Sequence, residues 1–143
     1  YEISNFCRHG FRSRHNSSYW QGKPYWGFGP AAHSFNGKNK RRWNIANNTL
    51  YLQNIRKNNI PFEEEILTME QQMNEAILIS LRTSEGLGLE NFSKKFGKNN
   101  AEKLLQNAQK FIAQKKMIFY NQRLVLQDEG KFLADGIAAD LFF

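Results

Sequence analysis

The chain has 143 residues, of which 41% are hydrophobic, and it carries a formal net charge of +7. Its single cysteine excludes an internal disulfide framework and is typical of a protein in the reducing cytoplasm, which is where we expect it. No apolar run reaches the roughly 18 residues that a membrane-spanning helix requires.

The charge is divided unevenly. Residues 1–60 hold ten Lys and Arg but a single acid, Glu2, which gives +9, whereas residues 61–143 hold ten bases and twelve acids, which gives −2. We therefore expect the N-terminal part to meet an anion and the C-terminal part to have an ordinary surface.

The N-terminal third is rich in Gly, Asn, Arg and aromatic residues and shows little periodicity. The alternation of apolar and polar residues predicts a strand over Tyr1–Phe6, at a sheet edge whose upstream neighbour is absent, and a second strand over Tyr25–Phe28. A short helix is predicted over residues 49–60, where a proline follows it. The run Glu63–Glu65 is expected to be a solvated linker.

The rest of the chain has helical periodicity. A capping box predicts a helix over residues 68–82, with Met69, Met73, Ile77 and Leu81 at helical spacing. A second, short helix is predicted over residues 89–96 and ends at Gly97. The third, over residues 100–115, carries a buried apolar stripe of Ala101, Leu104, Leu105, Ala108, Phe111 and Ile112.

A hairpin and a final helix follow. The apolar runs Met117–Tyr120 and Leu124–Leu126 flank Asn121-Gln122, which predicts two strands joined by a tight turn. A last helix is predicted over residues 128–141, with Leu133, Ile137 and Leu141 buried. Helix–helix–helix–hairpin–helix is close to the order of a winged-helix domain, which makes the predicted fold class α+β.

The nine-residue segment Arg12–Trp20 holds an imidazole, two guanidinium groups and two aromatic rings. The neutral imidazole of His15 has the chemistry of an axial ligand to haem iron. If the segment is helical, Tyr19 lies one turn beyond His15 with Trp20 beside it, so a flat macrocycle can rest on them. Arg12 and Arg14 are candidates to pair with haem propionates. The alternative is a structural, hydrogen-bonded histidine with both aromatic residues in the core.

Other groups of polar residues each leave two interpretations open. Cys7 with the three histidines has the ligand types of a zinc site but matches no common closed spacing. The glycines of Gly27–Pro30 suit either a phosphate or a tight turn. The basic run Lys38–Trp43 suits phosphates or anionic lipid, or a solvated loop. Glu2 is either an active-site carboxylate or a structural residue at the end of a barrel strand.

Several motifs together resemble the HemW family of haem chaperones. The first four are Tyr1–Phe6, His15–Trp20, Tyr25–Ser34 and Arg42–Asn44. The family's C-terminal domain is resembled by Asn74-Glu75, Leu81–Thr83, Glu85–Leu87 and Gly130–Asp135, with Ile137 and Leu141 after them. HemW proteins belong to the radical S-adenosylmethionine superfamily and are often labelled oxygen-independent coproporphyrinogen III oxidase-like. The motif at His15 is the most specific, because it resembles the one that separates the chaperones from coproporphyrinogen dehydrogenases.

The resemblance implies a C-terminal fragment of a larger protein. Residues 1–60 are expected to be the tail of a partial (β/α) barrel with a linker helix, and residues 61–143 a winged-helix-like domain. The family's [4Fe–4S] cluster is held by three cysteines spaced C-x3-C-x2-C, which this chain lacks. We therefore expect the cluster and most of the S-adenosylmethionine site to lie upstream, and the fragment alone not to be an enzyme.

The resemblance also implies a cargo and a partner: haem, and a haemoprotein acceptor that receives it. It assigns haem binding to the motif segment, comprising Arg12, Arg14, His15, Asn16, Tyr19 and Trp20, with His15 as the iron ligand. Two residues depart from the family pattern, since Cys7 stands where a small residue, often Ala, is expected, and Ala31 stands where Gly is usual.

Two other functions remain as alternatives. In the first alternative, the parent protein is a coproporphyrinogen III dehydrogenase of porphyrin biosynthesis. In the second, the C-terminal part is a DNA-binding winged-helix module. The motif at His15 argues against the first, and the net charge of −2 after residue 60 argues against specific DNA binding. A peripheral membrane contact and a homodimer are left open.

Overall fold

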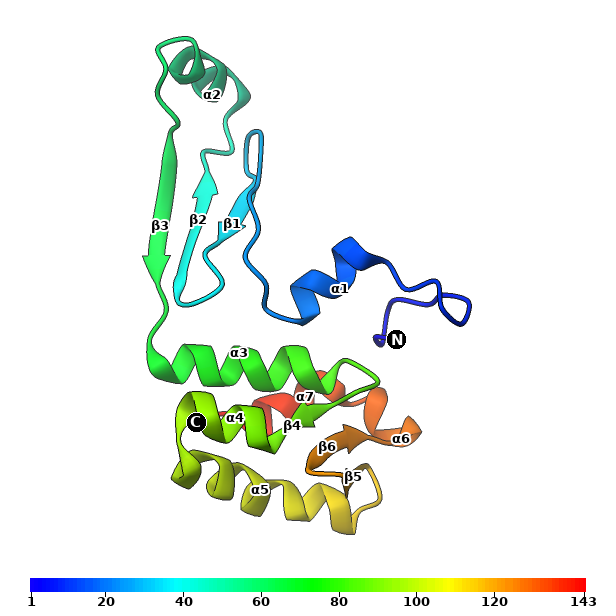
Figure 1. Cartoon of the computed structure of the whole chain (residues 1–143). Helices are drawn as coiled ribbons and strands as arrows, with labels where there is room; N and C mark the ends of the chain where they lie inside the picture. The colour runs from blue at the N-terminus through cyan, green and yellow to red at the C-terminus, as the bar shows by residue number, and fades with distance from the viewer. The chain divides into compact units, whose positions relative to one another are not determined.

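The computed structural model describes residues 1–143, and the chain forms two compact units (Figure 1). One unit is Gly22–Thr68, and the other combines Tyr1–Gln21 with Met69–Phe143. This division differs from the expected boundary between residues 60 and 61, because the first 21 residues pack with the C-terminal part of the chain. The mixture of helices and antiparallel sheets agrees with the expected α+β class.

The unit Gly22–Thr68 is built on a three-stranded antiparallel sheet in the order β1-β2-β3. Its strands are β1 (His33–Phe35), β2 (Lys40–Asn44) and β3 (Phe62–Ile66). The prediction of a linker at Glu63–Glu65 is wrong, because these residues lie in β3. Of the basic run, Lys38 and Asn39 lie in the turn before β2, whereas Lys40–Trp43 lie in the strand itself. Cross-strand pairs join β2 to β3: Lys40 forms an ion pair with Glu64 at 2.9 Å, and Trp43 Nε1–H donates to Glu63 at 3.1 Å.

The predicted strand Tyr25–Phe28 is reduced to one isolated bridge between Tyr25 and Phe35. The helix predicted over residues 49–60 is confirmed but shorter, since α2 covers Asn48–Ile55. The side chain of Asn47 caps it by accepting a hydrogen bond from the Leu50 N–H at 3.0 Å. None of its residues is buried, so α2 contributes little to a core.

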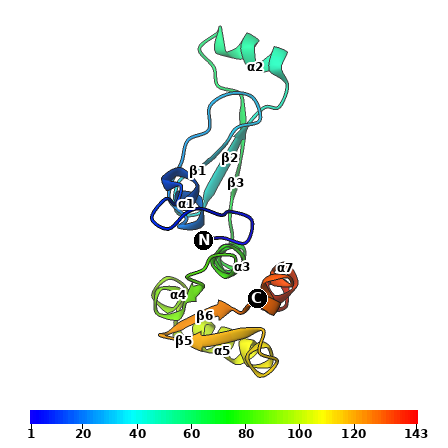
Figure 2. The same cartoon turned by 90° about the vertical axis from the view of Figure 1, so that its right-hand side faces the viewer.

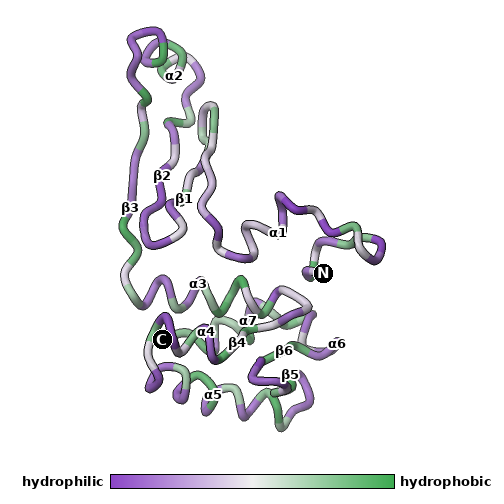
Figure 3. Tube along the Cα trace, in the orientation of Figure 1, coloured by the Kyte–Doolittle hydropathy of each residue, from purple (hydrophilic) through white to green (hydrophobic).

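Three helices of the second unit lie where the sequence predicted them: α3 (Met69–Leu81), α4 (Leu89–Phe96) and α5 (Lys98–Ala113). Each buries most of its apolar stripe, but Met69 is exposed and Leu105 and Ile112 are only partly buried. Figure 3 shows hydrophobic and hydrophilic residues alternating along α5. Figures 1 and 2 both place α3 and α5 on opposite sides of α4, α7 and the small sheet. The apolar core lies between these elements, with Ile77, Leu104 and Met117 fully buried.

The hairpin is confirmed as β5 (Met117–Tyr120) and β6 (Arg123–Leu126). The turn residues Asn121 and Gln122 both have positive φ, 48° and 59°, as a two-residue turn of this kind requires. A third strand, β4 (Leu87–Gly88), pairs with β6 and was not predicted, because two residues carry no periodicity.

The single helix predicted over residues 128–141 is wrong, since two helices occupy it: α6 (Asp128–Lys131) and α7 (Ala134–Asp140). Gly130 fixes α6 so closely to the backbone of Lys116 that an added Cβ would lie 2.0 Å from its carbonyl oxygen. The α7 helix instead packs against α3. One straight helix cannot satisfy both contacts, and Leu133, which was expected to be buried, is exposed at the break.

The segment Tyr1–Phe6 forms a tight turn rather than a strand, with isolated bridges from Glu2 to Asn5 and to Thr83. The carboxylate of Glu2 is fully buried and accepts hydrogen bonds from the Arg82 Nε–H at 2.9 Å, the Ser4 N–H at 2.9 Å and the Asn5 side-chain amide. Of the two interpretations of Glu2, this geometry favours the structural one. No helix combines the length and hydropathy needed to cross a bilayer.

Candidate functional site

The segment singled out from the sequence folds as helix α1, which covers Arg14–Trp20. Its N-terminus is capped by Ser13, whose hydroxyl accepts a hydrogen bond from the Asn16 N–H at 3.2 Å. The helical spacing assumed for the haem hypothesis is therefore present, and it divides the candidate residues between two faces of the helix.

One face carries His15 and Tyr19, which lie one turn apart. The Tyr19 hydroxyl is 2.9 Å from Nε2 of His15, and the two rings meet edge to face, with centroids 5.0 Å apart. Both side chains are exposed. Arg14, at the start of the same helix, is also exposed, and its guanidinium group has no hydrogen bond or ion pair. This face thus presents an imidazole and a phenol to solvent, while Arg14, one residue before His15, lies about 100° away around the helix axis.

The other face holds the helix to the rest of its unit. Arg12 forms an ion pair with Glu85, and its Nη2 donates to the Ser84 hydroxyl at 3.0 Å. Asn16 donates to the hydroxyl of Tyr1 at 3.1 Å. These bonds anchor α1, so Arg12 reaches a haem propionate only by giving up its ion pair with Glu85.

Trp20 lies on this second face as well. Its ring centroid is 6.0 Å from the Arg82 guanidinium group, which is a cation–π contact. Its indole Nε1 is buried without a hydrogen-bond partner. The structure therefore separates Asn16 and Trp20 from His15 and Tyr19. The spacing indicated this for the helical residues: positions 16 and 20 are four residues apart, as are 15 and 19 on the neighbouring face, whereas Arg12 precedes the N-cap Ser13.

The ion pair beneath α1 shifts the titration of its carboxylate. Burial raises the pKa of Glu85, but the hydrogen bond and the charge of Arg12 act in the opposite direction, so the pKa lies below its ordinary value of 4.5. Glu85 is consequently ionised at neutral pH and keeps Arg12 bound to it. A polar pocket of about 390 Å³ adjoins this pair, with Trp20 and Arg123 among its lining residues.

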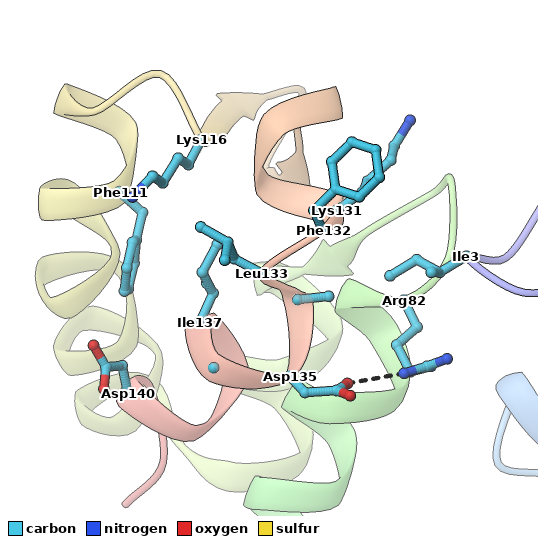
Figure 4. Close-up of a pocket in the computed structure, with 12 residues that line it drawn as sticks. Ile3, Arg82, Phe111, Lys116, Lys131, Phe132, Leu133, Asp135, Ile137 and Asp140 are labelled. Atoms are coloured by element: carbon cyan, nitrogen blue, oxygen red, sulfur yellow. Dashed lines mark hydrogen bonds and ion pairs between the residues drawn. The ribbon is translucent and has the colours of Figure 1, made fainter.

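A larger cavity, of about 730 Å³, lies between α5, α6 and α7 (Figure 4). Its walls include the apolar side chains of Phe111, Phe132 and Ile137. Four of the charged side chains that line it are in ion pairs: Arg82 with Asp135 at 2.8 Å, as the dashed line in Figure 4 marks, Asp140 with Lys110, and Lys131 with Asp128. These pairs leave few polar groups that could converge on a ligand.

The basic strand β2 also has partners within its own unit. Lys40 pairs with Glu64 at 2.9 Å. The guanidinium group of Arg42 lies 4.9 Å from the ring centroid of Trp26 and 4.8 Å from that of Phe62. These contacts occupy two of the cations that the phosphate or lipid interpretation of the run would use.

The glycine segment serves a turn. A Cβ at Gly27 would lie 2.2 Å from the carbonyl oxygen of His33, so the two backbones meet where no side chain fits. Gly29 has a φ of +100°, and Ala31 a φ of +57°. The turn interpretation thus fits better than the phosphate one. Cys7 is exposed and free, and the chain contains no cluster of three His, Cys, Asp or Glu side chains suited to a metal ion.

Comparison with known proteins confirms the resemblance seen in the motifs. Residues 67–133 match the HemN C-terminal domain. The heme chaperone HemW of Bacillus subtilis is 32% identical over 139 residues, which is 96% of this chain and 36% of the relative. HemW of Mycobacterium tuberculosis H37Rv is 33% identical over 144 residues, 99% of this chain and 34% of the relative. The chain thus spans about a third of the length of these relatives.

Two further similarities extend the comparison. A mouse protein named radical S-adenosyl methionine domain-containing protein 1, mitochondrial, is 58% identical over 33 residues, 23% of this chain and 8% of the relative. The solved structure of coproporphyrinogen III oxidase (HemN) from Escherichia coli, described as a radical SAM enzyme, aligns with a TM-score of 0.64 at 13% identity, over 91% of this chain and 34% of that one. At this identity the likeness concerns the fold alone.

Proposed function

We propose, from the premise that residues 67–133 belong to the HemN C-terminal domain family, that this chain is the C-terminal part of a HemW-like radical SAM protein. The full-length protein binds haem and delivers it to a haemoprotein acceptor. It holds its [4Fe–4S] cluster and S-adenosylmethionine through residues upstream of this chain, which has only one cysteine.

The observation that carries the proposal is the outward face of α1. The imidazole of His15 is exposed, and a neutral imidazole is a standard ligand of haem iron. Tyr19 beside it supplies apolar ring surface, whose burial under a macrocycle contributes about 25 cal/mol per Å². Arg14, on the adjoining side of the same helix, supplies an exposed guanidinium group for a propionate. The residue types on this face and beside it therefore fit haem as a cargo.

The remaining motif residues have a supporting role in this proposal. Arg12, Asn16 and Trp20 hold α1 against its unit from the neighbouring side, so that the exposed face keeps its orientation while haem enters and leaves. Haem, when bound, supplies an iron that accepts an imidazole nitrogen. The protein's own contribution is to present that nitrogen, an aromatic ring and a cation together.

We also propose a winged-helix-like arrangement for the C-terminal domain, formed by α3, α4 and α5 with the hairpin β5–β6, and a place for residues 1–60 at the end of a partial barrel. The DNA-binding alternative gains no support from α5, the third helix. Lys98 pairs with Glu102, Lys110 pairs with Asp140, and Lys103 lies 4.8 Å from the ring centroid of Phe143.

The test is a haem titration of the full-length protein with the variant His15→Ala, followed at the Soret band, together with its melting temperature. We expect the band to be lost while the melting temperature stays unchanged, because His15 has no partner in the core. His9→Ala is the matched control, since His9 is also exposed and lies in the same unit. An unchanged Soret band in His15→Ala would refute the proposal. Porphyrin product analysis on the same protein tests the dehydrogenase alternative.

A further inference from the structure

The hydrogen bond between Tyr19 and His15 involves Nε2 of His15, a ring nitrogen that could ligate the iron. An imidazole ligates metal through the lone pair of a ring nitrogen, and in this structure Nε2 of His15 lies 2.9 Å from the Tyr19 hydroxyl. If the hydroxyl donates, the lone pair is occupied. If Nε2–H donates instead, the nitrogen carries a proton and has no lone pair to offer. In either tautomer Nε2 is unavailable until the bond opens.

The bond follows from the local geometry of α1. Residues four apart on a helix lie on one face, and the two rings meet edge to face at an angle of 84°. His15 is exposed, so its side chain has room to rotate away from Tyr19. The backbone beneath them is anchored by the opposite face, through Arg12 and Asn16. Opening the bond therefore requires a side-chain rotation and no movement of the helix.

We propose that the Tyr19 hydroxyl is an internal competitor for the iron-binding nitrogen of His15, so that the protein holds haem less tightly than an unhindered imidazole on the same helix would. The inference rests on the proposed haem function. A hydrogen bond of ordinary net strength favours the closed pair by about fivefold, which corresponds to about 1 kcal/mol. The apparent affinity for haem falls by the same factor, because only the open fraction of the protein binds.

This competition suits a protein that has to release haem to an acceptor protein. When the iron leaves Nε2, the Tyr19 hydroxyl takes its place, and the hydrogen bond that forms offsets part of the loss of the iron–nitrogen bond. Rebinding is slowed because most His15 side chains are then closed. Tyr19 thus acts as a positioning residue with two functions: its ring offers a surface to haem, while its hydroxyl lowers the affinity for haem by slowing its rebinding.

The test is the variant Tyr19→Phe in the full-length protein, which keeps the ring and removes the hydroxyl. Haem affinity from the Soret titration should rise about fivefold, mainly through faster association, with the dissociation rate unchanged. Tyr120→Phe is the matched control, because Tyr120 is exposed at 66% in the hairpin, away from α1. A purely structural role for Tyr19 would leave the affinity unchanged or lower it, and either result would overturn the inference.

Measuring His15→Ala in the same series separates the two proposals. If His15→Ala abolishes binding and Tyr19→Phe does not strengthen it, the competitor is refuted and the haem function stands. If His15→Ala binds as the wild type does, the haem function fails, and the competitor fails with it. The ¹⁵N chemical shift of His15 Nε2 in the haem-free protein gives an independent measurement. We expect Tyr19→Phe to change it, and an unchanged shift would show that the bond does not form in solution.

Discussion

Replacing Arg82 by leucine should destabilise the unit that contains α1 and the C-terminal helices. The Nε of Arg82 pairs with Glu2 at 2.9 Å, Nη1 with Asp135 at 2.8 Å, and Nη2 donates to the Ser4 hydroxyl at 3.1 Å. The Glu2 side chain has no exposed surface, whereas that of Arg82 is 23% exposed. Arg82→Leu keeps most of the aliphatic stem but leaves a buried carboxylate without its cation.

The magnitude follows from the burial of the two partners. Removing one member of a buried ion pair costs about 3–5 kcal/mol. Two donors from Ser4 and Asn5 remain on the Glu2 carboxylate, and water can reach the partly exposed site of Arg82, so the lower end applies. We expect the free energy of unfolding to fall by about 3 kcal/mol.

Urea denaturation of this chain measures the effect, with fluorescence of Trp20 as a local probe. The double variant Glu2→Gln/Arg82→Leu should recover at least about 1 kcal/mol, because a neutral amide no longer needs the cation. Lys131→Leu is the control, since its pair with Asp128 is on the surface and should contribute nothing measurable. A loss of less than about 1 kcal/mol in Arg82→Leu would show that Glu2 is solvated or protonated without its partner, and would refute the reasoning.

Further predictions concern the turn, the ion pair beneath α1, local stability and DNA. Ala31→Gly should stabilise the unit Gly22–Thr68 by up to about 1 kcal/mol in thermal unfolding, because φ at Ala31 is +57°; a loss of stability would contradict this. Because folding lowers the pKa of Glu85, its contribution to stability is fully present above pH 4.5 and is lost as the pH falls through the folded-state value; an acid titration of unfolding should show this dependence in the wild type and not in Glu85→Gln. Amide hydrogen exchange should be faster in residues 22–68 than in α3 and α5, and fastest in α2, which has no buried residue; equal protection of the two units would argue against it. Short DNA duplexes should show no salt-dependent shift with residues 68–143 at physiological ionic strength, since the net charge after residue 60 is −2 and two lysines of α5 are in ion pairs, and a clear shift would overturn that expectation.

Much of the C-terminal unit was predictable because its elements form from neighbouring residues. The helix α4 begins and ends at the residues predicted for it, with Gly97 at a φ of +95° after its last turn. The hairpin was predictable because its turn depends on two adjacent residues alone. Likewise, the contact of His15 with Tyr19 follows from their spacing once the segment is a helix.

The second face of the candidate site was not predictable in the same way. Arg12 was expected to pair with haem, but its partner, Glu85, lies 73 residues further along the chain. No residue near Arg12 in the sequence indicates that the carboxylate of Glu85 is its partner. The same is true of Glu2, whose burial depends on an arginine 80 residues away. Only the spacing of positions 16 and 20 contained a signal that two of these side chains share a face.

The sequence by itself determined the helices and the hairpin, since hydrogen bonds between residues four apart and the φ values of a two-residue turn are local quantities. The tertiary structure alone decided that β3 pairs with β2, that α6 and α7 are separate helices, and which of the motif residues face solvent. Each of these outcomes depends on contacts between distant segments: glutamates opposite arginines, Gly130 against the backbone of Lys116, and Arg12 against Glu85. Such contacts form only once the chain has folded, because they compensate the loss of conformational entropy only when the core has brought their partners together.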